Sequence, residues 1–505
     1  MSLSASSAPT ATTCHGRPER GRQDVESQDM DVNHSQVGLL RYGAYVPYYR
    51  LQRSAIGSFL SGGGGKGTRS VASYDEDTTS MGVEAARLTL TGVGAEVLPQ
   101  RVLFASAKPA YADKSNAAVI QAALLLDRSN LSLDMCGSVR SGVGAIIAAI
   151  ESTVPSLVLL SDIRVGLPGG GDEKNGGDAA AGLLFGAPTV DDPAIATVLS
   201  HAHVTEEFLD RWRLPEAETS HTWEERFAEQ IYVTLAEEAY ADALKRAGIT
   251  ADDVDHLIVV GVHDRAAVTF ARSAGVSDAA RVADLIPEIG NAGTAQLGVV
   301  LADVLDRAGP DEVIAAVILA DGASAIVLRT TEDLAERRMP VSVKDQIAQG
   351  NSDLSYASFL TWRGFLDREP PRRPDPPAPA APPSFRSTRF KYGFEGSRCN
   401  ACGEVHLPAV RVCTACGAVD DMDPIAMASA RATVRTFTVD RLAYSLNPPI
   451  VAAVIDFDGG GRFNCQLTDV DPAAIAIGQR VEMTFRRPIT ASGVHNYFWK
   501  ARPCR

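Results

Sequence analysis

Short apolar runs alternate with amphipathic stretches between about Val37 and Arg329. The runs RVLFASA, LSLDM and SLVLLSDIRV predict strands, whereas the apolar spacing in NAAVIQAALLLD and SGVGAIIAAIES predicts helices. SLVLLSDIRV is apolar along most of its length, which is typical of a strand buried on both faces. Alternation of this kind indicates a layered α/β fold.

The second half of this region repeats the same rhythm. TLAEEAYADALKRAGI predicts a helix that ends at Gly248, and AQLGVVLADVLDRAG predicts another helix. HLIVVGV, VIAAVILA and ASAIVLR predict strands. The two halves therefore share the order of their elements.

The pattern changes twice after residue 340. Within SYASFLTWRGFL, four aromatic residues recur at near-helical spacing, and we expect a helix that docks on one of the two flanking domains. A helix that binds a separate partner is the alternative. The following EPPRRPDPPAPAAPPS is too rich in proline to fold and predicts a stiff linker at a domain boundary.

The C-terminal region opens with two C-x-x-C pairs, Cys399 with Cys402 and Cys413 with Cys416, separated by ten residues. Each pair can bind one side of a tetrahedral ion, and the glycine after each pair suits a tight turn. Four thiolates leave no open coordination position, so the pattern predicts a structural site for one Zn²⁺. Unligated cysteines or a redox pair are the alternative.

Five strand-like segments follow the cysteines: ATVRTFTVDRL, IVAAVIDFD, GRFNCQLTD, QRVEMTFRR and VHNYFWKA. Turn residues such as Gly459 and Asp471 separate them. Five short strands of this length predict an all-β, OB-type barrel.

Charge and composition narrow the choice of partners. The 505 residues include 48 Lys and Arg against 62 Asp and Glu, for a net charge of -14. Nucleic acids and anionic membranes favour basic surfaces, so we expect neither as the main partner. No apolar run approaches the roughly 20 residues that span a bilayer. Residues 1–36 are polar and lack an export signal, which predicts a disordered tail and a cytoplasmic protein with reduced cysteines.

Five motifs of the first region carry a resemblance to a known family: YGAYVPYYRL, YDEDTTSMGVEAARLTL, AYADKSNAAVIQAAL, NGGDAAAGLLFG and IGNAGTAQLG. Over roughly residues 37–330 the chain resembles the 3-hydroxy-3-methylglutaryl-CoA (HMG-CoA) synthase branch of the thiolase superfamily. The resemblance implies a five-layered αβαβα fold, a homodimer formed through this region, and a coenzyme A thioester as substrate.

The cysteine-rich GSRCNACGEVHLPAVRVCTACG resembles the zinc ribbons that accompany thiolase-like acyl-CoA enzymes together with an OB-fold. This second resemblance implies that the barrel supports an active site and that a separate thiolase is a candidate partner. The expected organisation has five parts: a disordered tail (1–36), a thiolase-like acyl-CoA domain (37–335), a docking helix with the proline-rich linker (336–384), a zinc ribbon (385–420) and an OB-fold (421–505).

The first resemblance also places the family's catalytic groups on residues of this chain. His263 takes the position of a histidine that holds a substrate carbonyl, and Asn291 that of an asparagine that orients it. The position of the cysteine nucleophile falls on Val139 and that of the glutamate acid/base on Ala107, and neither side chain can do this chemistry. Cys136 lies near a predicted helix N-terminus, which would lower a thiol pKa, and is a candidate displaced nucleophile.

Each of these residues has a structural alternative. A histidine at a strand end often serves only the fold, an asparagine between glycines often serves only a turn, and a free cysteine is commonly inert. The assignments therefore leave three hypotheses. The first is an acyltransferase related to HMG-CoA synthase, with Cys136, His263 and Asn291 as its catalytic groups.

The second hypothesis keeps the coenzyme A thioester but omits the covalent acyl step. Retro-aldol cleavage of a 3-hydroxyacyl-CoA needs only a base and a stabilised enolate, so it does not require the missing cysteine. The third hypothesis is a non-catalytic subunit that binds acyl-CoA or serves as a scaffold, since a fold alone does not imply chemistry.

Overall fold

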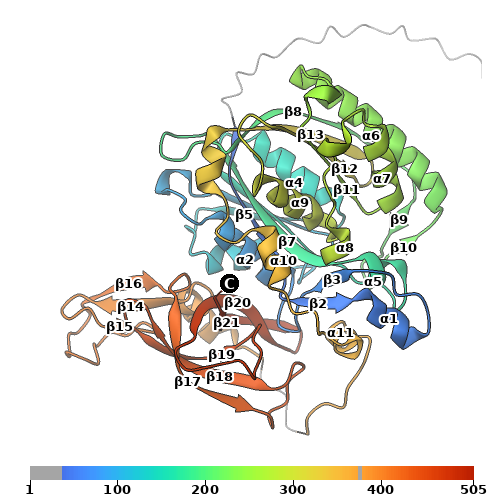
Figure 1. Ribbon diagram of the computed structural model, residues 1–505. Coiled ribbons are helices and arrows are strands. Elements are labelled where there is room, and N and C mark those ends of the chain that lie inside the picture. The colour runs from blue at the N-terminus through green and yellow to red at the C-terminus, as the bar shows by residue number, and fades with distance from the viewer. Residues whose placement is uncertain (1–36, 373–377, 505) are drawn as a thin grey trace, which may run out of the picture. The chain divides into compact units, whose positions relative to one another are not determined.

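The computed structural model describes residues 37–372 and 378–504, and the predicted tail over residues 1–36 lies outside this part. A nine-stranded sheet runs through the first region in the order β11-β12-β13-β8-β1-β7-β6-β4-β5 (Figure 1). Its strands are β1 (Gly38–Tyr45), β4 (Arg101–Ser106), β5 (Leu131–Cys136), β6 (Ser156–Ile163), β7 (Asp178–Gly186), β8 (Ala196–Val204), β11 (His256–Gly261), β12 (Val313–Leu319) and β13 (Ala323–Thr330).

Two half-sheets join at one short pairing. Strands β1 and β8 pair only at Gly38 with Thr197 and at Leu39 with Ala196. One half is β1-β7-β6-β4-β5 and the other is β8-β13-β12-β11. In the first half β4 is parallel to β5 and β6, and in the second half β11 is parallel to β12. Each half therefore has an edge at which parallel strands end together.

Helices cover both faces of both half-sheets, which gives the five-layered αβαβα arrangement. The outer face of the first half carries α2 and α3, the space between the halves holds α4 and α9, and α6 and α7 cover the second half. The bounds are α2 (Thr78–Thr89), α3 (Ala117–Ala123), α4 (Arg140–Ile150), α6 (Glu225–Ala247), α7 (Asp264–Ser273) and α9 (Gln296–Leu305).

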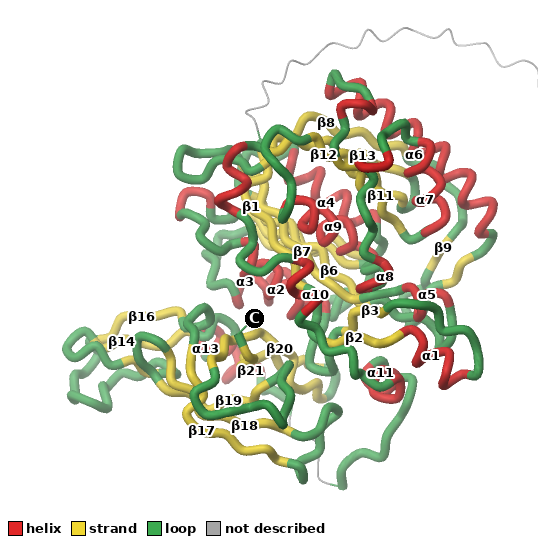
Figure 2. The backbone as a smooth tube through the Cα atoms, viewed as in Figure 1, coloured by secondary structure: helices red, strands yellow, loops and turns green. Residues whose placement is uncertain are grey.

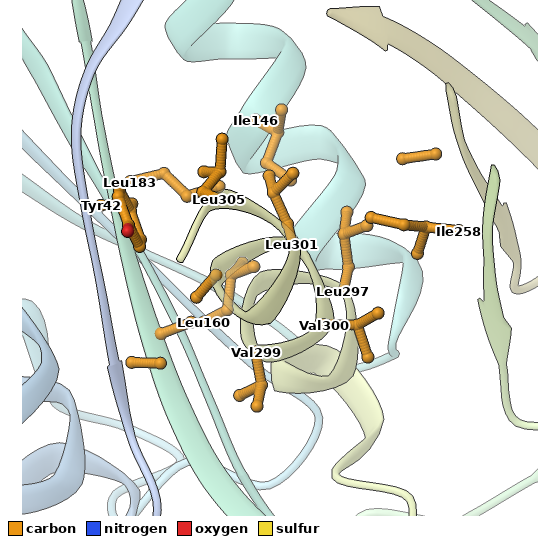
Figure 3. Packing of buried hydrophobic residues seen from close by; sticks show 14 of the residues in the cluster. Tyr42, Ile146, Leu160, Leu183, Ile258, Leu297, Val299, Val300, Leu301 and Leu305 are labelled. Atoms are coloured by element: carbon orange, nitrogen blue, oxygen red, sulfur yellow. The ribbon is translucent and has the colours of Figure 1, made fainter. Parts of the chain in front are cut away.

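The core between the half-sheets is built around α4 and α9. Figure 3 shows Ile146 of α4 beside Leu301 of α9, with Leu183 of β7 and Ile258 of β11 on either side. Every residue of α9 is buried, as expected for a helix that has a sheet on two sides. The predicted helices and strands of this region are confirmed, including the end of α6 at Gly248, whose φ of 70° favours glycine.

A smaller cluster holds the aromatic helix α11 (Tyr356–Trp362). Phe359 is buried there with Tyr49, and Trp362 donates from Nε1 to the carbonyl of Leu446 at 3.1 Å. The expected docking helix is thus present, and it contacts both the first region and a loop of the C-terminal barrel. Further short elements are β2 (Tyr49–Gln52), α1 (Arg53–Leu60), β3 (Thr68–Val71), α5 (Gly171–Asn175), β9 (Arg211–Trp212), β10 (His221–Thr222), α8 (Ile286–Ile289) and α10 (Val343–Ala348).

The proline-rich segment departs from its prediction at one end. Residues 373–377 lie outside the described part, but Ala381–Arg386 forms helix α12 and Thr388–Lys391 forms α13. The expectation that the whole segment stays unfolded is therefore wrong. Proline is tolerated in the first helical turn, where its missing N–H has no partner to lose, and α12 places its prolines there.

The C-terminal region contains a three-stranded ribbon and a closed five-stranded barrel (Figure 2). The barrel order is β17-β18-β19-β21-β20, and the predicted five strands are confirmed. The strands are β14 (Glu395–Cys399), β15 (Val405–His406) and β16 (Met422–Ala426) in the ribbon, and β17 (Ala432–Asp440), β18 (Ile450–Phe457), β19 (Arg462–Leu467), β20 (Arg480–Ala491) and β21 (Val494–Pro503) in the barrel.

Buried charges join the barrel to α2 and to the segment before it, within one compact unit. Arg486 of β20 contacts Glu76 at 2.6 Å and Asp469 at 2.6 Å, and Lys500 of β21 contacts Asp75 at 2.7 Å. None of these side chains is more than 5% exposed. Further contacts join Arg502 to Glu84, Arg487 to Asp77 and Tyr497 to Asp77. A charge left unpaired at this interface would be costly, so these pairs hold the barrel in one position.

Candidate functional site

A pocket of about 280 Å³ lies where the parallel strands of both half-sheets end. Ala107 follows β4, Val139 comes shortly after β5, and Arg164 follows β6. Val262 after β11 and Ala320 after β12 line the pocket from the second half-sheet. Residues just past the carboxyl ends of parallel strands are held firmly yet reach solvent, which is where α/β folds place ligand sites.

The two positions predicted for the missing nucleophile and acid/base line this same pocket. Val139 and Ala107 come from different strands and both contribute apolar side chains to the wall. Cys136 is not among the lining residues, and in the described part of the chain no cysteine lines this pocket. The structure therefore brings these two predicted positions into one pocket and leaves the candidate nucleophile outside it.

Cys136 is the last residue of β5 and is exposed. Desolvation of its sulfur, and next the carboxylate of Asp134, raise the thiol pKa to about 12. The expectation that a helix N-terminus lowers this pKa is wrong, because α4 begins only at Arg140 and the nearest charge is negative. Such a thiol is almost fully protonated at neutral pH and is a weak nucleophile.

A buried carboxylate orders one wall of the pocket. Asp162 in β6 is 1% exposed and accepts hydrogen bonds from the backbone N–H of Ala107 at 2.8 Å and of Thr294 at 2.7 Å. The hydroxyl of Ser106 donates to it at 2.9 Å. Three donors on two segments fix these segments relative to each other, so Asp162 determines where Ala107 lies.

The glycine that follows Val139 in the family pattern has a packing role here. A Cβ atom on Gly142 would meet Cγ2 of Thr294 at 2.9 Å, closer than real contacts allow. Glycine therefore lets α4 approach the Thr294 turn.

A second pocket of about 450 Å³ adjoins the first, and His263 and Asn291 line it. The two pockets share Arg164, Arg211 and Val262 among their lining residues. The residues predicted from the family pattern are thus divided between two neighbouring pockets.

Both ring nitrogens of His263 form hydrogen bonds with backbone groups. Nδ1 accepts from the N–H of Ala266 at 3.1 Å and caps α7, and Nε2 lies 2.9 Å from the carbonyl oxygen of Glu225. A carbonyl only accepts, so Nε2 carries the proton and the imidazole is neutral. His263 in this arrangement links α7 to the start of α6, and the prediction that it holds a substrate carbonyl stays a prediction.

Asn291 is also fully engaged with its neighbours. Its Nδ2 donates to the carbonyl of Gly261 at 2.6 Å, and its Oδ1 accepts from the N–H of Gly293 at 2.9 Å. The side chain therefore connects the end of β11 to the glycine turn. Its predicted role in orienting His263 is likewise still a prediction.

Two arginines bring positive charge to the wall between the pockets. Arg211 contacts both carboxylate oxygens of Asp172, at 2.9 and 2.6 Å, and Arg164 contacts the same carboxylate at 3.1 Å. Burial, followed by the nearby Arg211, lowers the pKa of Arg164. Asp162 and Asp264 also face Arg164, and Asp210 faces Arg211, so this wall offers charges of both signs to a ligand.

Sequence patterns missed several residues of these pockets. Asp162 is the penultimate residue of a buried apolar strand, and a lone carboxylate in that context was a usable signal. Arg211 and Asp210 lie in a stretch without periodicity, and Tyr232 sits among other apolar positions of α6. Only the fold brings Arg211, Asp210 and Tyr232 to the same place.

The four cysteines of the ribbon meet at one point, with all their sulfur atoms within 4.8 Å of one another. The backbone N–H of Gly403 donates to the carbonyl of Cys399 at 2.8 Å, and that of Gly417 to Cys413 at 3.0 Å. The φ angles of 78° and 80° at Gly403 and Gly417 are left-handed, which explains a glycine after each cysteine pair. Four converging sulfur atoms match the donor set and the tetrahedral geometry that Zn²⁺ prefers.

One further side chain approaches this cluster. Nε2 of His406, which is buried, lies 3.4 Å from the Sγ of Cys413. A donor at this distance stabilises a thiolate and orients it toward a metal.

Comparisons with known proteins agree with this division of the chain. Residues 391–421 match the family described as the ChsH2 rubredoxin-like zinc ribbon domain, and residues 426–486 match the ChsH2 C-terminal OB-fold domain. A DUF35 domain-containing scaffold protein of Methanocaldococcus jannaschii is 31% identical over 125 residues, which cover 24% of this chain and 88% of that protein.

The first region is similar to HMG-CoA synthases. The hydroxymethylglutaryl-CoA synthase of Methanosphaera stadtmanae is 27% identical over 352 residues, covering 65% of this chain and 99% of that protein. The solved structure of MvaS in complex with 3-hydroxy-3-methylglutaryl coenzyme A superposes with a TM-score of 0.56 at 18% identity, covering 68% of this chain and 94% of that one. Among the helices described here, none is long and apolar enough to cross a membrane.

Proposed function

Because the chain belongs to the DUF35 family in its C-terminal region and joins that region to an HMG-CoA synthase-like, thiolase-fold region, we propose that it acts on coenzyme A thioesters. The reaction makes or breaks a carbon–carbon bond beside the thioester. Coenzyme A as part of the substrate is supported by the synthases that the first region resembles, one of which was solved with coenzyme A bound.

The residues that line the 280 Å³ pocket are the observation on which we choose among the three hypotheses. Val139 and Ala107, the positions onto which the resemblance places the nucleophile and the acid/base, line it, and Cys136 does not. Transfer of an acyl group to the protein requires a nucleophile inside the pocket. We therefore propose the non-covalent route, retro-aldol cleavage of a 3-hydroxyacyl-CoA, as the activity that this site supports best.

The HMG-CoA synthase hypothesis is the second candidate, supported by the synthases that match 65% of the chain. It depends on Cys136, whose raised pKa and position outside the pocket disfavour it. The scaffold hypothesis draws support from the DUF35 relative, which is named a scaffold protein, and from the backbone hydrogen bonds of His263.

Two measurements on the purified protein separate the hypotheses. Intact mass after incubation with acetyl-CoA and acetoacetyl-CoA, for the native protein and Cys136→Ala, should show no acyl adduct in either. Release of a ketone or aldehyde from a panel of 3-hydroxyacyl-CoA thioesters should then be detected. An adduct that disappears in Cys136→Ala would establish the synthase route, and binding without any release would leave the scaffold.

We propose a structural Zn²⁺ bound by Cys399, Cys402, Cys413 and Cys416. The convergence of four sulfur atoms and the match to a zinc ribbon family support this assignment. With four protein ligands the ion has no position open for substrate, so its contribution is to the stability of the ribbon.

We also propose that the protein forms a homodimer through strand β5. This strand is the edge of the nine-stranded sheet, and its Leu131 and Leu133 are 49% and 44% exposed. An exposed apolar edge strand is a template for pairing with another chain. Light scattering should show a dimer that Leu133→Lys dissociates; if the native protein is a monomer, a separate thiolase is the candidate partner for this edge.

A further inference from the structure

Tyr232 and Asp210 form a buried pair between the two pockets. Tyr232 of α6 lines the 280 Å³ pocket, and Asp210, just before β9, lines the adjoining pocket. The Asp210 carboxylate and the backbone N–H of Asp321 are polar neighbours of the tyrosine hydroxyl. Both residues are almost completely buried, at 2% and 6% exposed.

Packing fixes the tyrosine ring and thereby the position of its hydroxyl. The ring meets Phe208 edge-on with centroids 4.9 Å apart and lies 5.8 Å from the ring of His263. A hydroxyl that ring packing holds in place in advance needs little reorganisation to exchange a proton with a ligand.

We propose that Tyr232 is the catalytic proton-transfer residue of this pocket and that Asp210 is the proton acceptor behind it. This inference rests on the proposed retro-aldol function. It assigns an acid/base group where Ala107 cannot supply one. Tyr232 touches the substrate, whereas Asp210 acts through Tyr232.

The steps balance without any other reactant. The 3-hydroxyl proton of a 3-hydroxyacyl-CoA passes to the Tyr232 oxygen while the Tyr232 proton passes to Asp210. The electrons of the O–H bond form the carbonyl at C3, the C2–C3 bond breaks, and its electron pair becomes the thioester enolate. C2 then takes the proton of Tyr232, and Asp210 returns its proton to the tyrosine.

The electrostatic surroundings suit these roles. Burial raises the pKa of Asp210, which makes its carboxylate a better proton acceptor near neutral pH. Burial, followed by the Asp210 charge, raises the pKa of Tyr232, so the phenol stays protonated and acts as a donor. The other charged or titratable groups that face the pair are Asp321, Arg211, His263 and Arg140.

A purely structural role is the alternative, in which the contact between Tyr232 and Asp210 only anchors the loop around Asp210 to α6. The two roles differ in one measurement, the exchange of the C2 hydrogens of acetyl-CoA with deuterium from D₂O. A loop anchor affects stability and ligand binding, whereas a proton-transfer residue changes the exchange rate at unchanged binding.

The experiment compares the full-length protein with Tyr232→Phe, Asp210→Asn and the control Tyr240→Phe. Tyr240 lies on the same helix, and its buried hydroxyl has no hydrogen-bond partner among the described residues. We expect Tyr232→Phe to slow exchange by about 100-fold or more, with coenzyme A binding unchanged and Tyr240→Phe at the native rate. We expect Asp210→Asn to slow the exchange. In the native protein the exchange rate should rise with pH as Asp210 loses its proton, and this rise should be absent in Asp210→Asn.

The outcomes distinguish this inference from the proposed function. If the native protein exchanges and both variants exchange at its rate, the pair is not the proton relay while the proposed function stands. If the native protein binds acetyl-CoA but exchanges no deuterium and cleaves no 3-hydroxyacyl-CoA, both proposals fail. If Tyr232→Phe does not fold, the exchange rate of Asp210→Asn and its pH dependence test the inference.

Discussion

The ammonium group of Lys500, on the last strand of the barrel, lies 2.7 Å from the carboxylate of Asp75 in the thiolase-like region. Both side chains are buried, at 5% and 0% exposed. The two residues are 425 positions apart in the chain. This pair belongs to the charge network that joins the two regions, and it makes the barrel part of the fold around the pocket.

Replacing Lys500 with methionine should destabilise the protein by about 3–5 kcal/mol, because the buried Asp75 carboxylate then keeps only Arg486, at 3.7 Å, as a cationic partner. Urea unfolding followed by tryptophan fluorescence measures this change. Arg462→Ala is the matched control, because its ion pair with Asp456 in the barrel is 62% and 39% exposed. The control should change stability by less than about 1 kcal/mol. An equally small effect of Lys500→Met would show that the buried pair does not hold the barrel.

The same interface should weaken in acid. Lys500 and Arg486 hold the pKa of Asp75 at about 2, below its ordinary 3.8, despite burial, and Arg87 and Arg502 do the same for Glu84.

A carboxyl group whose pKa is lowered on folding contributes stability above its unfolded pKa, and that stability is lost as the pH falls toward its folded pKa. Burial raises the pKa of Glu76, which opposes the trend at that position. We therefore expect the unfolding free energy to fall between about pH 5 and pH 2. A smaller acid dependence in Asp75→Asn would confirm the source, and an unchanged one would exclude it.

Removing one cysteine of the ribbon should remove the metal. We expect Cys402→Ser to lose the single equivalent of zinc and to lower the melting temperature, because metal binding and folding of the ribbon are coupled. Cys504→Ser is the control, since Cys504 lies outside the cluster and should leave one equivalent bound. Metal analysis and thermal unfolding of protein purified without chelator measure both effects. Zinc retained by Cys402→Ser would contradict the four-cysteine site.

A barrel residue should control the mobility of a pocket wall. The backbone N–H of His495 donates to the Tyr111 hydroxyl at 2.7 Å, and the ring centroids of His495 and Tyr111 are 4.4 Å apart. The His495 Nε2 lies 3.3 Å from the carbonyl oxygen of Ala110. This loop leads back to Ala107 in the pocket. We expect His495→Ala to speed hydrogen exchange of the amides over residues 107–116. Val494→Ala is the control, because Val494 is an exposed neighbour in the same hairpin, and it should leave the exchange of these amides unchanged. Equal exchange in both variants would show that His495 does not order the loop.

Returning a thiol to the pocket should restore covalent chemistry. Val139 lines the pocket and is the N-cap of α4, so a cysteine at this position lies at a helix N-terminus that favours the thiolate. We expect Val139→Cys to gain the mass of one acetyl group after incubation with acetyl-CoA. The gain should persist in the double variant with Cys136→Ala. No adduct in either variant would show that acetyl-CoA does not place its carbonyl near residue 139.

The order of elements and the four-cysteine cluster followed from the sequence alone. The apolar run of β6, the glycine that ends α6 and the five strands of the barrel were predicted correctly, because hydrophobic period and turn residues act over a few neighbouring positions. The four cysteines were also predicted as one cluster, since the spacing within each pair already limits the geometry of the turn.

The tertiary structure decided which side chains share a pocket and how they are charged. Val139 and Ala107 meet because β4 and β5 are parallel neighbours, and Tyr232 reaches the same pocket from a helix of the other half-sheet. The raised pKa of Cys136 depends on partial desolvation of its sulfur by the surrounding chain and on Asp134, which no local pattern expresses. Contacts between distant segments and the desolvation of charges arise only when the whole chain packs, and the pocket and the buried interface depend on both.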